Sequence, residues 1–402
     1  MKTRGEAMLA LRKARMAAAP PFLRGGFRPF FFLAAVWAGF AALTWLCTTL
    51  HGVPLASEFA PLAWHRHEML FGFVSAAIAG FLLTAIPNWT GRLPIAGWPL
   101  AGLAGLWVAA RAAVWFSGAF GFLPAAVLDV GFYLVFAFVA GREVLAAKNR
   151  NIPVVGIVLL LALVDGWDYA AAAGLVADDL APSRAAIALV VVMISVIGGR
   201  IIPSFTRNWM AKRGFPHGLP GQPDRFDLGT IAVTAVALLG WVLLPTRTWV
   251  GGGLLAAGVL QAVRLARWRG WRTWSDPLVL ILHVGYAWLP LGLLLLGAGV
   301  TGADVPATAA IHALTAGAIA TMILAVMTRA SLGHTGRELR ANAATIGIYL
   351  CVSLGAGLRV LTGLGVLDYR LGIEASGGLW ALGFATFVLA YAPVLFLDSK
   401  RK

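Results

Sequence analysis

Stretches of about twenty apolar residues recur along the whole chain, and this feature sets the class of fold. Each stretch is long enough to cross the hydrocarbon core of a bilayer as one helix. Hydrophobic residues make up 60% of the chain and charged residues 12%, too few to give a soluble protein its surface. We therefore predict an all-α polytopic membrane protein. Its twelve expected spans are residues 30–50, 66–87, 99–118, 122–141, 152–175, 183–203, 228–246, 248–265, 276–299, 306–330, 342–363 and 375–397.

The 32 Lys and Arg residues are divided unequally between the two sides of these spans. With the N-terminus placed in the cytoplasm, most of them fall in cytoplasmic loops and termini, which is the positive-inside pattern of a plasma-membrane protein. The exceptions outside are Arg66, Arg184, Arg247 and Arg370. We predict cytoplasmic termini, a basic N-terminal segment over residues 1–29 and a single transmembrane domain over residues 30–398.

Two distant spans share one pattern. His67 lies twenty-three residues before Thr90-Gly91-Arg92, and His312 lies twenty-three residues before Thr335-Gly336-Arg337. Each histidine is also followed five residues later by a glycine, Gly72 or Gly317. The pattern indicates an internal repeat with a histidine at the same depth in both copies. The competing interpretation is that two lipid-facing helices drifted to similar composition.

The repeat relates the second and tenth spans, and the sixth span ends in a similar Thr-Arg-Asn-Trp string at residues 206–209. This spacing suggests three units of four helices, an architecture that resembles the haem-copper oxidase core. The sixth and seventh spans contain no histidine, so the copper ligands of that superfamily are missing. The likeness is therefore one of architecture only.

Histidines inside spans are the first candidates for a cofactor site, because ionisable groups are costly in a membrane and usually face an interior site. Imidazole suits haem iron, and the repeat relates His67 to His312, so we predict a bis-histidine haem near the outer face. On a straight helix His65 projects about 160° away from His67, which predicts a second centre, haem or copper, on the other flank. A hydrogen-bonded packing role is the simpler alternative for each histidine.

Charged residues at similar depth could complete these sites. Arg66, Arg111 and Arg359 are candidate partners for haem propionates, and Asp129, Asp165 and Asp168 are candidate proton carriers. Structural ion pairs, such as Arg111 with one of the aspartates, are an equally good interpretation. His283 and His334 form a candidate inner metal site that lacks further ligands.

The inner ends of three spans are rich in Arg, Thr and Trp, as in Thr90-Gly91-Arg92. Such residues anchor helix ends at the membrane interface. They could also line a site for an anion or a quinol headgroup. Anchoring is the interpretation that we favour.

At these strings the sequence resembles the NnrS family of bacterial membrane proteins. The resemblance covers nearly the whole chain and rests on four segments: residues 65–73, 80–92, 200–209 and 312–337. It implies a twelve-helix protein of the bacterial inner membrane that contains haem, of b type, and copper. It also implies a link to nitric oxide metabolism and to resistance against nitrosative stress.

These expectations combine into a haem-bearing membrane protein that binds, reduces or otherwise handles nitric oxide, with quinol as one possible electron donor. A quinol-linked nitric oxide oxidoreductase is the enzymatic form of this hypothesis. The competing class is a transporter or exporter in which buried Arg, Asp and His residues form the substrate path, although carriers usually repeat as six plus six helices. A sensor or chaperone is a third possibility.

Overall fold

The computed structural model describes residues 10–398 apart from 12, 13, 15, 16 and 216. Contacts between its helices divide the chain into two compact units, whereas the repeat had suggested three units of four helices. Unit 1 comprises residues 1–182, 330–338 and 387–402, and unit 2 comprises residues 183–329 and 339–386. The basic residues of the predicted N-terminal segment that precede position 16 fall outside the described part, Arg4 and Lys13 among them.

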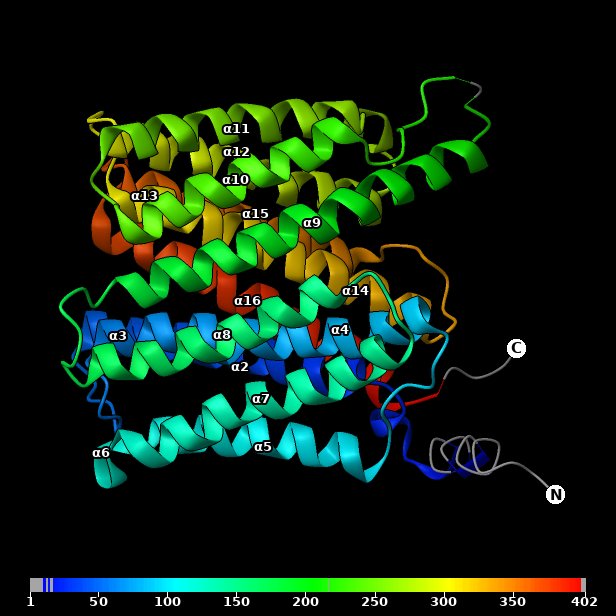
Figure 1. Cartoon of the computed structure of the whole chain (residues 1–402), viewed down its shortest axis with the longest axis horizontal. Helices are drawn as coiled ribbons and strands as arrows, with labels where there is room; N and C mark the ends of the chain where they lie inside the picture. Colours follow the sequence, from blue (N-terminus) through cyan, green and yellow to red (C-terminus); the bar gives the residue numbers. More distant parts are fainter. Residues whose placement is uncertain (1–9, 12–13, 15–16, 216, 399–402) are drawn as a thin grey trace. The chain divides into compact units, whose positions relative to one another are not determined.

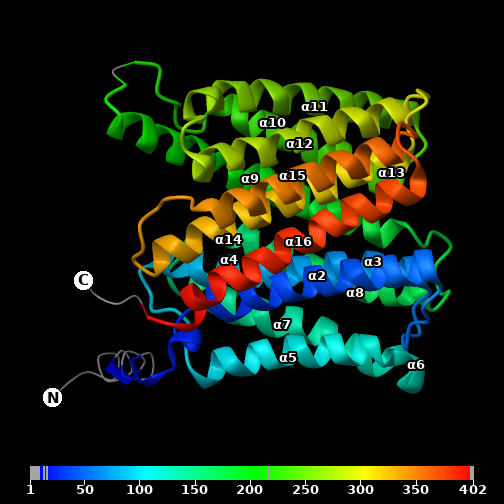
Figure 2. The same ribbon diagram turned by 180° about the vertical axis from the view of Figure 1, so that it is seen from behind.

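Unit 1 begins with a short turn and continues with antiparallel helices (Figure 1). Pro61 at the first position of α3 and the left-handed Gly52 after α2 mark where one helix ends and the next begins. In the rear view of Figure 2, α2 lies against α3 and α4, and α5 lies beside α7. The elements are η1 (Pro21–Leu23), α2 (Phe27–His51), α3 (Pro61–His67), η2 (Glu68–Phe73), α4 (Val74–Thr90), α5 (Trp98–Trp115), α6 (Ser117–Phe120), α7 (Phe122–Ala146) and α8 (Ile152–Ala172).

Three helices of unit 2, α10, α12 and α15, begin with polar caps. Asp224 and Asp227 form a reciprocal capping box at α10, and the Asp276 side chain accepts a hydrogen bond from Leu278 N at the start of α12. The elements that follow α8 are α9 (Ala181–Lys212), α10 (Arg225–Leu243), α11 (Thr248–Arg267), η3 (Gly270–Thr273), α12 (Pro277–Val300), α13 (Ala307–His312), η4 (Ala313–Ala320), α14 (Thr321–His334), α15 (Ala343–Gly363) and α16 (Tyr369–Phe396). Of these, α9, α14 and α16 contribute residues to both units.

The helical content confirms the predicted all-α polytopic membrane protein. Within the described residues, eleven helices are long and apolar enough to cross a membrane, and no strand occurs. Every predicted span overlaps a helix. The span predicted at 99–118 corresponds to α5, which is not among the eleven because Pro99, two glycines and Arg111 lower the hydropathy of its 18 residues.

Candidate functional site

The two repeat histidines occupy the same local structure. His67 is the last residue of α3, and the next six residues form the π-helix η2. His312 is the last residue of α13, and the next eight residues form the π-helix η4. Wide π-turns are rare and are found frequently at functional sites. The repeat seen in the sequence therefore has a structural counterpart, with a histidine at each α-to-π junction.

In each copy of the repeat, the glycine has no side chain, and this leaves room for a tryptophan of the preceding long helix. A Cβ atom on Gly72 would lie 2.7 Å from Nε1 of Trp37 in α2. A Cβ atom on Gly317 would lie 2.6 Å from the ring of Trp288 in α12. Both distances are shorter than side chains tolerate, so only glycine permits these contacts.

In unit 1, His67 is completely buried between two carboxyl groups. Its Nδ1 lies 2.9 Å from Oδ2 of Asp168, and its Nε2 lies 3.0 Å from Oδ2 of Asp129. Asp129 also accepts a hydrogen bond from the Tyr169 hydroxyl, at 3.2 Å. The rings of Phe59, Phe71 and Tyr169 surround the imidazole, with centroids 4.6, 5.3 and 5.0 Å away. The histidine is thus held by carboxylates inside an aromatic cage.

Arg111 neutralises part of this cluster. Its Nη1 donates to Oε2 of Glu68 at 2.7 Å, and its Nη2 forms an ion pair with Oδ1 of Asp129. Nε1 of Trp37 donates to the same Glu68 oxygen at 2.6 Å. The interpretation of Arg111 as the partner of a buried aspartate is confirmed. Its side chain is therefore committed to protein carboxylates, although it was predicted to pair with a haem propionate.

The cluster carries more negative than positive groups. Glu68, Asp129, Asp165 and Asp168 are balanced only by Arg111 and His67, and all six are buried. Asp165 is fully buried, and neither of its oxygens has a hydrogen-bond partner among the described residues. Its Oδ1 lies 3.9 Å from Nδ1 of His67, so the carboxyl group faces the cluster.

In unit 2, His312 is only half-buried and has one free ring nitrogen. Its Nδ1 lies 2.7 Å from the carbonyl oxygen of Thr308, which places the proton on Nδ1 and the lone pair on Nε2. Nε2 makes no hydrogen bond with any described residue. A histidine fixed in this way is prepared to bind a metal through Nε2.

Arg359 of α15 lies near His312. A Cβ on Gly363 would lie 2.9 Å from Cα of Ala309 in α13, and Val360 packs against Ala309. Arg359, one turn before Gly363, is therefore on the face of α15 directed toward α13, close enough to interact electrostatically with His312. Within the described part of the chain Arg359 forms no ion pair. The position after His312 is Ala313, whereas Glu68 follows His67, so unit 2 lacks the carboxylate that occupies Arg111 in unit 1.

The other predicted site residues have local partners. The ring of His65 stacks on Trp45, at 4.6 Å between centroids, so it faces a different neighbour from His67. Arg66 lies 3.4 Å from Asp179. Nε2 of His283 lies 2.8 Å from the Thr206 hydroxyl in unit 2, while His334 belongs to unit 1 and lies 5.7 Å from the ring of Phe27.

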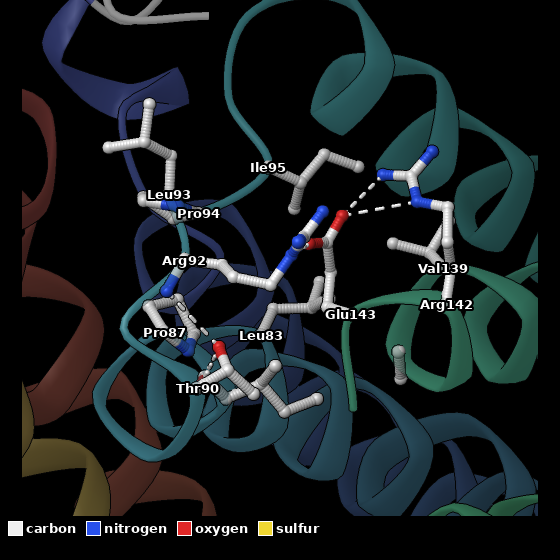
Figure 3. Close-up of a pocket in the computed structure, with 12 residues that line it drawn as sticks. Leu83, Pro87, Thr90, Arg92, Leu93, Pro94, Ile95, Val139, Arg142 and Glu143 are labelled. Carbon is white, nitrogen blue, oxygen red and sulfur yellow. Dashed lines mark hydrogen bonds and ion pairs between the residues drawn. The ribbon is translucent and has the colours of Figure 1, made fainter. Parts of the chain in front are cut away.

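A pocket lies beside the Thr90-Gly91-Arg92 motif of unit 1 (Figure 3). The Glu143 carboxylate of α7 is held between Arg92 and Arg142, and the Thr90 side chain lies below Arg92. The remaining lining is apolar, formed by Leu83, Ile86, Pro87, Leu93, Pro94, Ile95, Val139 and Ala140. The arrangement combines an apolar wall with a charged rim.

The fold and these sites define a multi-pass α-helical membrane protein with two histidine sites, one enclosed by carboxylates and one open. A model of the NnrS protein family matches residues 21–398, nearly the whole chain. The chain belongs to the NnrS family, which links this membrane protein to nitric oxide. Proteins of this family bind metal and haem in general. No curated protein matches the chain.

Proposed function

We propose that this protein binds haem and copper and uses them to handle nitric oxide in the membrane, by binding it, by reducing it or by protecting against nitrosative stress. Family membership supports the link to nitric oxide. The observation that carries the haem assignment is the half-buried His312 with a free Nε2. The distribution of basic residues supports an inner-membrane protein with cytoplasmic termini.

His312 and Arg359 suit a haem in complementary ways. The Thr308 carbonyl orients the imidazole and increases the basicity of Nε2, as expected of an axial ligand. Arg359 supplies a guanidinium group that is free to pair with a propionate. Haem held by His312 alone would supply an iron able to bind nitric oxide.

The sequence predicts His67 as the second axial ligand. Both of its ring nitrogens already lie within hydrogen-bond distance of carboxylates, so a bis-histidine haem requires the His67 ring to leave Asp129 or Asp168. This observation favours a haem with one protein ligand, His312. His65 remains the predicted ligand of the second centre, haem or copper, and His283 and His334 remain the predicted inner metal site, which needs a further ligand to hold copper. The lone pair of His283 is on Nδ1, because Thr206 donates its proton to the Ile202 carbonyl and accepts from Nε2.

The test is the absorption spectrum of protein purified from haem-replete cells. We expect a Soret band in the native protein and a loss of haem of about tenfold or more in His312→Ala, because the axial bond and its orienting hydrogen bond disappear together. His51→Ala, at the exposed end of α2, is the matched control and should retain haem.

The spin state separates the two modes of ligation. A high-spin spectrum that changes on addition of nitric oxide supports one histidine ligand, and a low-spin bis-imidazole spectrum that is lost in His67→Ala supports the pair predicted from the sequence. Native protein that is folded but colourless would contradict the haem proposal and point to the transporter class.

Quinol as electron donor is supported by the pocket at Arg92, which joins an apolar wall to a charged rim. We expect Arg92→Ala to slow quinol-driven reduction of the haem about tenfold, the contribution of one charged hydrogen bond. Glu143 keeps Arg142 as a partner in this variant, so the fold should persist. Reduction by dithionite should be unchanged, and Arg150→Ala, an exposed arginine of the same unit, should behave as native. Equal quinol rates in all three proteins would exclude this pocket.

A further inference from the structure

We propose that the carboxylate cluster of unit 1 is a binding site for a divalent transition-metal ion, with His67, Asp129 and Asp165 as its ligands. One donor atom from each of these residues lies within 4.8 Å of the others. Imidazole and carboxylate together suit ions such as Zn²⁺ and Fe²⁺. The proposal goes beyond the haem function and does not depend on it, because the haem is assigned to His312 in unit 2.

The donor atoms are arranged for such an ion. Ions of this kind lie about 2.0–2.2 Å from nitrogen and oxygen ligands, so opposing donors are separated by up to about 4.4 Å. The donor atoms of His67, Asp129 and Asp165 all lie within 4.8 Å of one another, close to that range. The three ligands come from α3, α7 and α8; α7 packs against α8, and hydrogen bonds join His67 of α3 to carboxylates of both. Rigid helices hold ligands more reproducibly than loops do.

The neighbouring residues support the same assignment. Asp168 lies 2.9 Å from Nδ1 of His67, so it can hold this nitrogen as a donor while Nε2 binds the ion beside Asp129. Asp165 approaches the ring at Nδ1, at 3.9 Å, so its carboxyl group must turn toward Nε2 to complete the ligand set. A carboxylate behind a metal-binding histidine is a common arrangement. Arg111 holds the other oxygen of Asp129 and thereby orients the carboxylate that would bind the ion through Oδ2.

The strongest indication is Asp165. A fully buried carboxyl group without any hydrogen bond is costly, and a cation or a proton is needed to offset the cost. With His67 charged, the cluster has an excess of two negative charges. A divalent ion on neutral His67 would reduce that excess to one.

The experiment measures metal content and thermal unfolding of the full-length protein in detergent. After dialysis against Zn²⁺, and removal of loose metal, the native protein should retain an ion that is lost on chelation. Asp165→Asn should lower the affinity at this site at least tenfold, and Asp168→Asn should also weaken it. Glu374→Gln, an exposed carboxylate of unit 2, is the control and should bind Zn²⁺ as the native protein does.

Thermal unfolding separates a metal site from a structural cluster. With Zn²⁺ the native protein should unfold at a higher temperature than Asp165→Asn. Without metal the order should reverse, because the variant no longer buries the unpaired charge. If Asp165→Asn and native protein bind Zn²⁺ equally, or if Zn²⁺ leaves the order unchanged, the cluster is neutralised by protons and the proposal is wrong. If Asp165→Asn retains haem, a failure of the Zn²⁺ proposal leaves the assignment of haem to His312 unaffected.

Discussion

Replacement of Arg111 by Met should destabilise the protein by about 3–5 kcal/mol, the cost of removing one partner of a buried ion pair. Arg111 is 2% exposed and neutralises both Glu68 and Asp129. Methionine fills much of the volume of arginine but carries no charge, so the variant leaves the buried Glu68 without a cation and Asp129 with His67 alone. The measurement is the midpoint of thermal or denaturant unfolding in detergent.

The control for this prediction is Arg370→Met. Arg370 lies 3.1 Å from Glu374 on the surface of α16, with 64% of its side chain exposed, and such pairs contribute at most about 0.5 kcal/mol. Combining Arg111→Met with Glu68→Gln and Asp129→Asn should restore part of the lost stability, because the charges that Arg111 neutralised are then absent. An unfolding midpoint of Arg111→Met equal to that of Arg370→Met would show that the ion pairs do not stabilise unit 1.

Alanine at Gly72 or at Gly317 should cost about 1–3 kcal/mol, the usual penalty for overfilling a packed interior. The added methyl group would overlap Oε2 of Glu68 at the first position and would lie 2.6 Å from the Trp288 ring at the second. Glu68 cannot move away cheaply because Trp37 and Arg111 both hold that oxygen. Gly72→Ala should therefore be the more damaging of the two in an unfolding measurement.

Gly102→Ala and Gly347→Ala provide the comparison, since neither added Cβ would meet any atom within 4 Å. Alanine favours a helix over glycine by about 1 kcal/mol, so these two variants should be neutral or slightly stabilised. Tryptophan fluorescence adds a second measurement, because Trp37 and Trp288 must shift in the damaging variants alone. If all four variants unfold at the same midpoint, the close approach of tryptophan to glycine has no energetic importance.

The helices were predictable from the sequence because hydrophobic length alone determines a membrane span. The repeat was predictable as well, since His67 and His312 keep the same spacing to the Thr-Gly-Arg strings. The carboxylate cluster was only partly predictable. Asp129 and Asp165 stood out as charges within apolar segments, but their meeting at His67 depends on the packing of helices that are far apart in the sequence.

Other parts of the site gave no signal that sequence periodicity could detect. Glu68 follows His67 directly, and nothing in the segment 65–73 singles it out. Its carboxylate nevertheless accepts hydrogen bonds from both Arg111 and Trp37. The π-helices were also missed, because periodicity arguments assume 3.6 residues per turn throughout. An ideal α-helix drawn through residues 65–87 would therefore misplace the side chains beyond the wide turn relative to His65 and His67.

The π-turns divide each histidine-bearing span into two sections that share an axis but not an angular register. One extra residue in a turn offsets the section before it by about 100° relative to a continuous α-helix. Side chains before the turn, including the histidine, can therefore change to suit a ligand without disturbing the interfaces that α4 and α14 form with neighbouring helices. In each of these spans, natural substitutions before the glycine should therefore vary independently of natural substitutions after it.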